Sequence, residues 1–443
     1  MTHPPQVRPA PLPAGRSRLR TATTTEPGRL RIVGAVLAAL VVAFGAVTAV
    51  EVSDRASAAD DVVSRSQPLS ADAASVYRSL ADADTAAAGG FLAGAVKEPP
   101  GVRERYEKDI ALASRLLVKA ATNTDAASES GRQITTLNAE LPVYTGRIET
   151  ARAYNRQGLP LGGAYLRFAN EQMTKVLLPA AQRLYDAETA RLDRDDEKAS
   201  FWPVFSLAAG LLALGGLGWS QRRLYLRTNR VFNPGLLAAT AATTVVLLWL
   251  AAGHTVARDR LTEAREHGQS SLRVLNDARI DSLKARANEN LVLVARGAVL
   301  TDDGRNDKYE TEYAAGMVEL REGLERAARL ADDDAGRAPV EAAEAGMGEW
   351  QSRHRDAGTT DRAGNYEGAL KKVIGAEDST GESFDTVDAA LERALAHEQS
   401  EFSRAARDGR DALGGLPAGA AALGVLGAAG AILGVNRRLA EYR

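Results

Sequence analysis

The chain has 443 residues, a formal net charge of −2, 45% hydrophobic and 5% aromatic residues, and no cysteine. The length is typical of two or three domains, and the lack of cysteine excludes disulfide frameworks and thiolate metal sites. The domains must therefore be held together by packing alone.

Four apolar stretches without a charged residue organise the chain. A bilayer core of ~30 Å needs ~20 apolar residues in a helix. Three stretches approach or exceed that length. The second is short, so we expect it to extend through Phe201 and Trp202. The stretches are Ile32–Val50, Val204–Trp219, Gly235–Gly253 and Leu413–Val435.

Arginine gives the orientation of these predicted membrane helices, because Lys and Arg concentrate in short cytoplasmic segments. Residues 1–31 hold six arginines and one acid, 220–234 hold four arginines and no acid, and 436–443 hold three arginines and one acid. Removing these 13 arginines and two acids from the chain's 55 basic and 57 acidic residues leaves 42 basic and 55 acidic. We therefore expect a protein of the cell membrane with both termini in the cytoplasm and two acidic segments outside. The alternative for Ile32–Val50, a cleaved signal peptide, usually has an apolar core of only ~7–15 residues.

The predicted organisation follows in chain order. The tail 1–31 is basic, rich in proline and expected to be disordered. The other segments are the membrane helices 32–50, 203–219, 235–253 and 413–435, the outer segments 51–202 and 254–412, the cytoplasmic loop 220–234 and the cytoplasmic tail 436–443.

The first outer segment predicts four helices. Apolar residues recur at steps of three and four from Leu69 to Ala95, as on one face of a helix. Pro68 and Pro179 predict kinks, since proline removes a helical hydrogen bond. The helices are expected at 52–98, 102–121, 132–156 and 164–200, the last continuing into the membrane.

The second outer segment repeats this plan. Helices are expected at 254–300, 308–330, 339–356 and 365–413, the last interrupted near Gly375 and Gly381. At an offset of 203, the stretch Ile32–Val50 falls on Gly235–Gly253, and Leu80 falls on Leu283. This correspondence indicates an internal duplication.

No catalytic or metal-binding motif accompanies these helices. The five histidines lack metal-ligand spacing, and HExxH, GxxxxGK[ST] and GxSxG are absent. The acidic runs Asp302–Asp307 and Asp332–Asp334 lack the ligand spacing of a calcium loop and indicate turns. We therefore expect no enzyme activity, cofactor, metal or nucleic-acid partner.

The membrane helices carry no ionisable residue in their interiors, which argues against a transporter or pump acting alone. The fourth has glycines at steps of three and four, which allow close packing against its three siblings or against a second copy in a homodimer. These glycines are Gly424, Gly427, Gly430 and Gly434.

The cytoplasmic segments are too short to hold a catalytic domain, so any output must pass to a separate protein. Their arginines are the candidate contacts for that partner or for anionic membrane lipid. They are Arg222, Arg223, Arg227, Arg230, Arg437 and Arg438.

Two membrane helices flanking a four-helix outer domain resemble the sensory half of chemoreceptors and sensor kinases. The tandem of two such units, with IVGAVLAALVVAF, the loop SQRRLYLR and the end GVNRRLAEYR, is similar to GlnX-type actinobacterial membrane proteins. The resemblance implies an outer solute-binding lipoprotein that detects acidic amino acids and a soluble Ser/Thr kinase inside as partners.

The predicted fold is all-α, with four transmembrane helices and two tandem extracytoplasmic four-helix-bundle domains. The predicted function is a signal relay from an extracytoplasmic solute to a cytoplasmic partner. Two alternatives are a cell-envelope scaffold and a direct small-molecule receptor, and the receptor requires a buried Arg or Asn cluster in a bundle.

Overall fold

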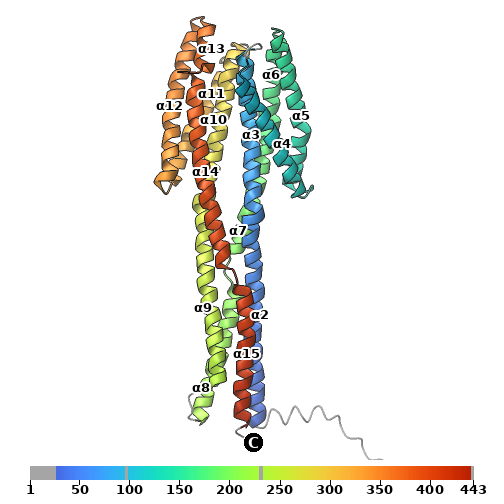
Figure 1. Cartoon of the computed structure of the whole chain (residues 1–443), viewed down its shortest axis with the longest axis vertical. Coiled ribbons are helices and arrows are strands. Elements are labelled where there is room, and N and C mark those ends of the chain that lie inside the picture. Colours follow the sequence, from blue (N-terminus) through green and yellow to red (C-terminus); the bar gives the residue numbers. More distant parts are fainter. Residues whose placement is uncertain (1–25, 95–97, 229–232, 441–443) are drawn as a thin grey trace, which may run out of the picture. The chain divides into compact units, whose positions relative to one another are not determined.

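The computed structural model describes residues 26–94, 98–228 and 233–440 (Figure 1). Within these ranges the chain is helical apart from short connections and one isolated bridge between Leu300 and Asp307. The first half contains α2 (Glu26–Asp61), the π-helical segment η1 (Val62–Ser66), α3 (Gln67–Leu92), α4 (Pro100–Thr122), α5 (Glu129–Arg156), α6 (Leu161–Gln172), the π-helical segment η2 (Met173–Leu177), α7 (Leu178–Ser200) and α8 (Val204–Thr228). The second half contains α9 (Pro234–Glu263), the π-helical segment η3 (Ala264–Gln269), α10 (Ser270–Ala295), α11 (Lys308–Leu330), α12 (Asp334–Arg362), α13 (Tyr366–Ile374), α14 (Thr380–Ala412) and α15 (Leu416–Ala440).

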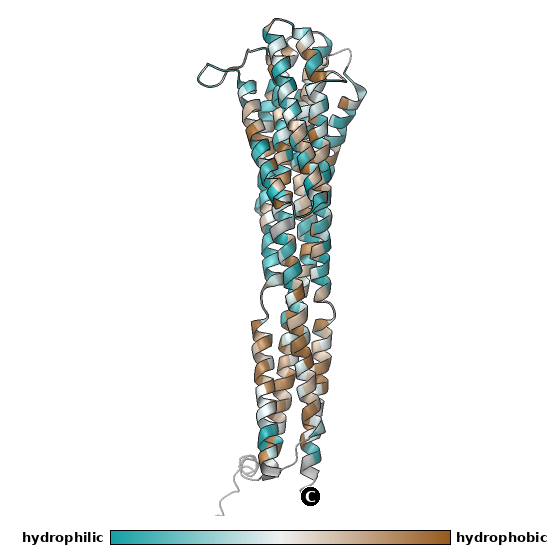
Figure 2. Ribbon diagram, turned by 90° about the vertical axis from the view of Figure 1, so that its left-hand side faces the viewer, coloured by the Kyte–Doolittle hydropathy of each residue, from teal (hydrophilic) through white to brown (hydrophobic). Residues whose placement is uncertain are grey.

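The chain forms two compact units. One, here called the membrane unit, comprises Met1–Ser57, Ala199–Arg258 and Arg410–Arg443, of which the structure describes 26–57, 199–228, 233–258 and 410–440. The other, here called the polar unit, comprises Ala58–Lys198 and Asp259–Gly409. Four helical runs are long and apolar enough to cross a membrane, as the sequence predicts. In Figure 2 the hydrophobic residues concentrate along α2, α8, α9 and α15.

Buried apolar residues join the four helices of the membrane unit. Leu37 and Val41 of α2 pack with Leu217 of α8, Leu236 of α9 and Ala431 of α15, and all five are buried. Burial of this kind excludes lipid from the seam, and dispersion between close-packed atoms then stabilises the bundle.

The second membrane helix begins later than the sequence suggests. The expected extension through Phe201 and Trp202 is wrong, because residues 201–203 are not helical and α8 begins at Val204. Arg55 of α2 donates hydrogen bonds to the carbonyl oxygens of Phe201 (2.7 Å) and Trp202 (2.9 Å). The carboxylate of Glu51 accepts one from the backbone N–H of Ser206 (2.7 Å). Side chains of α2 thus satisfy the backbone groups that the break leaves unpaired.

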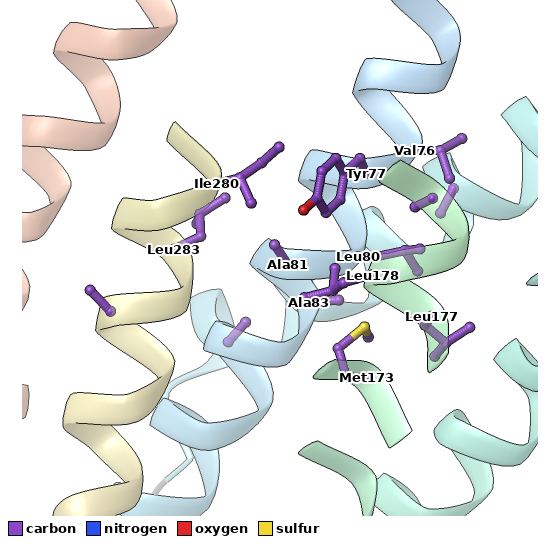
Figure 3. Packing of buried hydrophobic residues seen from close by; sticks show 14 of the residues in the cluster. Val76, Tyr77, Leu80, Ala81, Ala83, Met173, Leu177, Leu178, Ile280 and Leu283 are labelled. Atoms are coloured by element: carbon purple, nitrogen blue, oxygen red, sulfur yellow. The ribbon is translucent and has the colours of Figure 1, made fainter. Parts of the chain in front are cut away.

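The two halves share the core of the polar unit. Figure 1 shows α4–α6 flanking α3 on one side and α11–α13 flanking α10 on the other. Ile280 and Leu283 of α10 belong to the same buried cluster as Tyr77 and Leu80 of α3 (Figure 3). The hydroxyl of Thr85 on α3 also donates a hydrogen bond to the carbonyl oxygen of Leu283 (2.8 Å). The predicted separation into two bundle domains is therefore not confirmed, since both outer segments lie in one compact unit.

The helices support the predicted duplication. Adding 203 to the bounds of α3 gives those of α10, and both have 26 residues. α4 and α11 each have 23 residues, and α8 and α15 each have 25. The π-helical segments η1 and η3 also precede α3 and α10 at matching positions.

A π-helical segment lies directly before each proline at which the sequence predicts a kink. Pro68 follows η1 and Pro179 follows η2, and both lie inside helical runs that continue without a break. Proline removes one i→i−4 hydrogen bond, and the π-type bond from the N–H of Gln67 to the carbonyl oxygen of Val62 stands directly before Pro68. η3 has no proline, which shows that proline alone does not cause these segments.

Several predicted boundaries shift. α4 begins at Pro100, before the predicted start at residue 102. α12 extends on both sides of the predicted 339–356, and α10 ends at Ala295 instead of continuing to residue 300. The expected interruption at Gly375 is present, because residues 375–379 separate α13 from α14, but Gly381 lies inside α14.

Candidate functional site: a pocket between the two halves

A pocket of about 890 Å³ opens inside the polar unit where the two halves meet. This volume falls within the range of small-molecule sites. The first half contributes residues of α3 and α4, including Thr85, Gly89 and Arg105. The second half contributes residues of α10, α14 and the connection after α13, including Arg286 and Asn290.

Arg105 of α4 ties the two halves together beside the pocket. Its guanidinium lies 2.8 Å from Asp82 of its own half and 3.3 Å and 3.5 Å from Asp388 and Asp385 of the other. Burial lowers the pKa of Arg105, but the negative charges of Asp82 and Asp388 outweigh this effect and hold the pKa above its usual range. Arg279 of α10 binds the same Asp388 at 2.7 Å. Two arginines from different halves therefore share one carboxylate.

Arg286 is the buried cation of the pocket wall. It donates to the hydroxyl of Thr380 (2.8 Å), to the carbonyl oxygen of Val373 (3.0 Å) and to the carboxylate of Glu289. A Cβ at Gly381 would lie 2.9 Å from Nη2 of Arg286, so glycine there gives the guanidinium its room. These bonds attach the start of α14 and the end of α13 to α10.

Glu289 is supported from behind the pocket. It accepts hydrogen bonds from the indole of Trp350 (3.0 Å) and lies 2.8 Å from Nδ1 of His354. Burial would raise the pKa of Glu289, but Arg286 and His354 hold it below its usual value. Burial would likewise lower the pKa of His354, but its hydrogen bonds to Glu289 and Glu310 raise it to about 9. The cluster therefore keeps its charges at neutral pH.

Two groups of the pocket have hydrogen-bonding capacity to spare. Asn290 is 1% exposed, and its side-chain oxygen has no hydrogen-bond partner among the described residues. Such an orphaned polar atom costs free energy unless a ligand or water satisfies it. Arg393 of α14 lines the same pocket and has no ion-pair partner within the described ranges. The pocket thus offers one acceptor and one cation to a ligand.

The first half carries a related buried carboxylate. Asp84 of α3 accepts hydrogen bonds from the hydroxyl of Tyr144 (3.0 Å) and the amide of Asn170 (2.7 Å). Burial raises the pKa of Asp84 to about 6, although these two bonds oppose the rise. In each half an aromatic side chain of the third helix thus donates to a buried acid of the first. Among the described residues Asp84 has no ion-pair partner, whereas Glu289 has Arg286.

One further group of side chains has metal-binding geometry. Ligand atoms of Asp333, His397 and Glu401 lie within 4.8 Å of one another. Asp333 accepts a hydrogen bond from the N–H of Gly336 (2.6 Å), and this bond caps α12. The cap alone accounts for the position of this carboxylate.

The predicted contact arginines lie at one end of the membrane unit. Arg222 and Arg223 are exposed on α8, and Arg223 stacks 5.1 Å from the ring of Trp219. Arg437 is exposed on α15. The side chains of Arg227 and Arg438, and the whole of Arg230, lie outside the described residues, as does the predicted tail up to residue 25.

The predicted glycines of α15 face two neighbouring helices of the membrane unit. A Cβ at Gly424 would lie 3.0 Å from Cα of Gly45 on α2, and one at Gly427 would lie 3.0 Å from Val41. Cβ atoms at Gly430 and Gly434 would lie 3.1 Å and 3.0 Å from the backbone of Gly235 on α9. These contacts are those of the first predicted alternative, in which the fourth membrane helix packs against other membrane helices of the same chain.

None of the pocket residues was predicted from the sequence as a site residue, although Gly375 and Gly381 were named as helix interruptions. The one available signal is the run Arg286–Asn290, RANEN, where charged and amide residues fall between the apolar residues Leu283 and Leu291 of α10. Polar residues on a helix usually mark a solvated face. Only the packing of α10 against α3 places them inside.

Comparison with known proteins gives a family match for the first half of the polar unit. Residues 58–197 match the family model of the actinobacterial sensor domain. These limits nearly coincide with the first segment of the polar unit, Ala58–Lys198. No curated protein and no solved structure matches the chain. The match supports an actinobacterial sensor protein, and a sensor domain joined to four apolar helices suggests a signalling role at a membrane.

Proposed function

We propose that this chain is a multi-pass membrane sensor that binds a small solute outside the cell and relays its presence to a cytoplasmic partner. The observation that carries the proposal is the pocket built jointly by both halves of a unit whose first segment, residues 58–197, matches a sensor domain. A ligand in such a pocket contacts α3 and α10 together, so its binding favours one arrangement of the two helices over another.

Helical continuity supports the relay. The helix α2 continues through η1 into α3, and α9 continues through η3 into α10, without a non-helical residue. A change in the packing of α3 against α10 is therefore connected by unbroken helix to two membrane-crossing segments. Shifts of packed helices by ~1–2 Å are a known class of switching motion.

The spare groups of the pocket define the ligand. The side-chain oxygen of Asn290 requires a donor such as an ammonium or amide N–H, and Arg393 requires an anion. Glu382 and Asp385, which also line the pocket, add negative charge. A small molecule with both a cationic or amide group and a carboxylate satisfies all of these groups. An amino acid has this chemistry, and an acidic one is the specific candidate that the GlnX resemblance implies.

The arginines support the direction of the relay. The arginines of α8 and α15 lie at the end of the membrane unit where Asn233, at the start of α9, donates a hydrogen bond to the carbonyl oxygen of Gly434 (2.9 Å). With that end in the cytoplasm, Arg222, Arg223 and Arg437 are available to a cytoplasmic protein such as a Ser/Thr kinase, or to anionic lipid.

Indirect sensing is the second candidate function, with a solute-binding lipoprotein docked on the polar unit. The observation that favours it is a set of large apolar side chains left exposed near the loops that join α5 to α6 and α10 to α11. They are Leu159, Leu161, Phe168 and Leu300, with exposures of 44%, 49%, 56% and 50%. Exposed apolar surface is a frequent mark of protein interaction sites.

Calorimetric titration of amino acids into the full chain in lipid nanodiscs tests direct sensing. We expect a saturable heat for at least one amino acid. Arg393→Ala removes a charge-assisted hydrogen bond worth ~1.5–3 kcal/mol, which corresponds to ~10–150-fold weaker binding. Arg103→Ala is the matched control, because Arg103 pairs only with its neighbour Glu107 on the exposed surface of α4.

A complete absence of heat with every amino acid would remove direct sensing and leave the docked lipoprotein. Crosslinking in cells then decides the remaining question, since recovery of a solute-binding protein is expected only for indirect sensing. Equal binding by the wild type and Arg393→Ala would show that the ligand occupies a different site.

A further inference from the structure

A second cavity lies in the polar unit, between its four long helices. Its volume is about 290 Å³, near the lower limit for small-molecule sites. One stripe from each of α3, α7, α10 and α14 lines it, together with Gln269 of η3. On α3 the lining runs from Gln67 to Arg78, twelve residues whose eleven steps correspond to a length of ~16 Å. The cavity is therefore long and narrow.

Arg78, at one end of this cavity, makes no direct ion pair among the described residues, although Glu392 and Asp388 lie near enough to favour its charge. Arg78 donates to the amide oxygen of Asn276 and to the hydroxyl of Ser75 (2.9 Å), but no carboxylate oxygen among the described residues lies within 4.0 Å of it. Its neighbour Arg279 is compensated, because it binds Asp388 (2.7 Å) and lies 3.6 Å from Glu392. Burial and Arg279 lower the pKa of Arg78 to about 10.

An interior guanidinium with spare donors is costly unless an anion accompanies it. Arginine presents five N–H donors in a planar fork, and Arg78 uses two of its nitrogen atoms on neutral oxygens. The remaining donors include Nε, which has no partner among the described residues. This is the geometry that binds a carboxylate or a comparable oxyanion on two oxygens.

The rest of the cavity wall is mixed in character. Arg279 and Glu392, which pair with each other at 3.6 Å, line the cavity together with Arg78, and Tyr185 and hydroxyl side chains add further polar groups. Apolar side chains form much of the remaining wall, with the amides of Gln67, Gln269 and Gln399 among them. The apolar members are Ala71, Ala74, Leu192, Leu272, Leu395, Ala396 and Phe402. An inorganic ion alone would leave this apolar surface without a partner, whereas an organic body would fill it.

We propose that this cavity is a second ligand site, which binds a small organic anion with its carboxylate on Arg78 and its apolar body between α3, α7, α10 and α14. The site is independent of the pocket that contains Asn290 and Arg393. Because all four helices line it, an occupant adds contacts to both halves and stabilises the folded unit.

The test is the thermal stability of the full chain in nanodiscs with sodium hexanoate as the probe. At a hexanoate concentration ~100 times the Kd, we expect the melting temperature to rise by about 5–10 °C. Hexylamine and hexanol have the same apolar body without the anion, and phosphate is an anion without the body. We expect at least tenfold weaker effects from all three, and equilibrium dialysis of labelled hexanoate should give one molecule per chain.

Arg78→Met separates a ligand site from a structural role. If the role of Arg78 is to bind an anion, the Arg78→Met variant should have a melting temperature equal to or above that of the unliganded wild type, and it should no longer respond to hexanoate. If Arg78 serves only the fold, the variant melts lower and hexanoate acts on neither protein. Arg78→Lys, which keeps the charge but loses the fork, should bind hexanoate at least tenfold more weakly. Arg115→Met, an exposed change on α4, is the control.

Two outcomes would overturn the proposal. One is the absence of any hexanoate effect on the wild type, and the other is an undiminished effect in Arg78→Met and Arg78→Lys. The proposed function is tested separately, since Arg393→Ala should leave hexanoate binding unchanged and Arg78→Met should leave amino-acid binding unchanged. Failure of one site therefore says nothing against the other.

Discussion

Replacing His354 by glutamine tests the buried cluster behind the candidate pocket. His354 lies 2.8 Å from Glu289 and 3.2 Å from Glu310, and only 12% of its side chain is exposed. These carboxylates raise its pKa from 6.5 to about 9, a difference that corresponds to ~3 kcal/mol. Because the pKa is higher in the folded state, this stabilisation is fully present below pH 6.5 and is lost as the pH rises through 9.

The comparison of wild type and His354→Gln should therefore depend on pH. At pH 6 we expect the variant to melt about 6–12 °C lower than the wild type, since ~1 kcal/mol shifts the melting temperature of a large domain by ~2–4 °C. At pH 10 most of this difference should vanish, apart from the loss of the contact between His354 and the ring of Tyr313 at 3.8 Å. Other groups that titrate do so in both proteins, so the difference isolates His354.

NMR gives a direct check, because the chain has only five histidines. The signal missing from His354→Gln identifies the residue, and its titration midpoint should lie near pH 9. Glu310→Gln, which removes the more exposed partner, should lower the midpoint partly. A midpoint at or below 6.5, or a melting difference that does not change between pH 6 and pH 10, would refute the reasoning.

Two further changes test the membrane unit and the first half. Gly424→Val places a side chain 3.0 Å from Cα of Gly45 and should destabilise the bundle by ~1–3 kcal/mol, measured as a lower melting temperature in detergent. Gly218→Val, with nothing within 4 Å of its Cβ, should cost much less, and equal losses would contradict the packing. Tyr144→Phe removes a donor from the buried Asp84, so the chain should lose ~1–3 kcal/mol, and a neutral outcome in urea unfolding at pH 8 would argue against that bond.

Much of the architecture could be predicted because it depends on local signals. A run of ~20 residues without charge has few alternatives to a membrane helix, and glycine and proline end helices through their own backbone geometry. The repeat was visible for the same reason, since the bounds of α3 and α10 differ by the offset that the sequence gives. The break at residues 201–203 does carry a local signal, because Pro203 disfavours the helical conformation in the residue before it, and the expected extension through Phe201 and Trp202 overlooked this signal. Arg55, which satisfies the carbonyl groups of the break, lies far away in the chain.

The hydrophobic periodicity of the helices could not predict that the two halves share one core. The apolar stripe of α3 suggested one buried face, yet Ala74, Ala81, Ala86 and Ala88, which lie off that stripe, are buried as well. Alanine gives little contrast between faces, so an alanine-rich central helix looks like a surface helix with one stripe. The pocket residues were not predicted for a related reason, because Arg286 becomes an interior residue only once α3, α13 and α14 surround it.

Joining both halves in one polypeptide has a consequence for stoichiometry. A receptor that assembles a pocket from two identical chains forms it only above a threshold protein concentration, and twofold symmetry then gives it two equivalent pockets. Here Arg105 and Arg286 reach the same pocket from the two halves of one chain, so dilution cannot take the site apart. The halves are also free to diverge: at the offset of 203, Asp84 corresponds to Ala287 and Glu289 corresponds to Ala86. One molecule can therefore present a single pocket of this kind, and cooperativity between identical sites would require contact between separate chains.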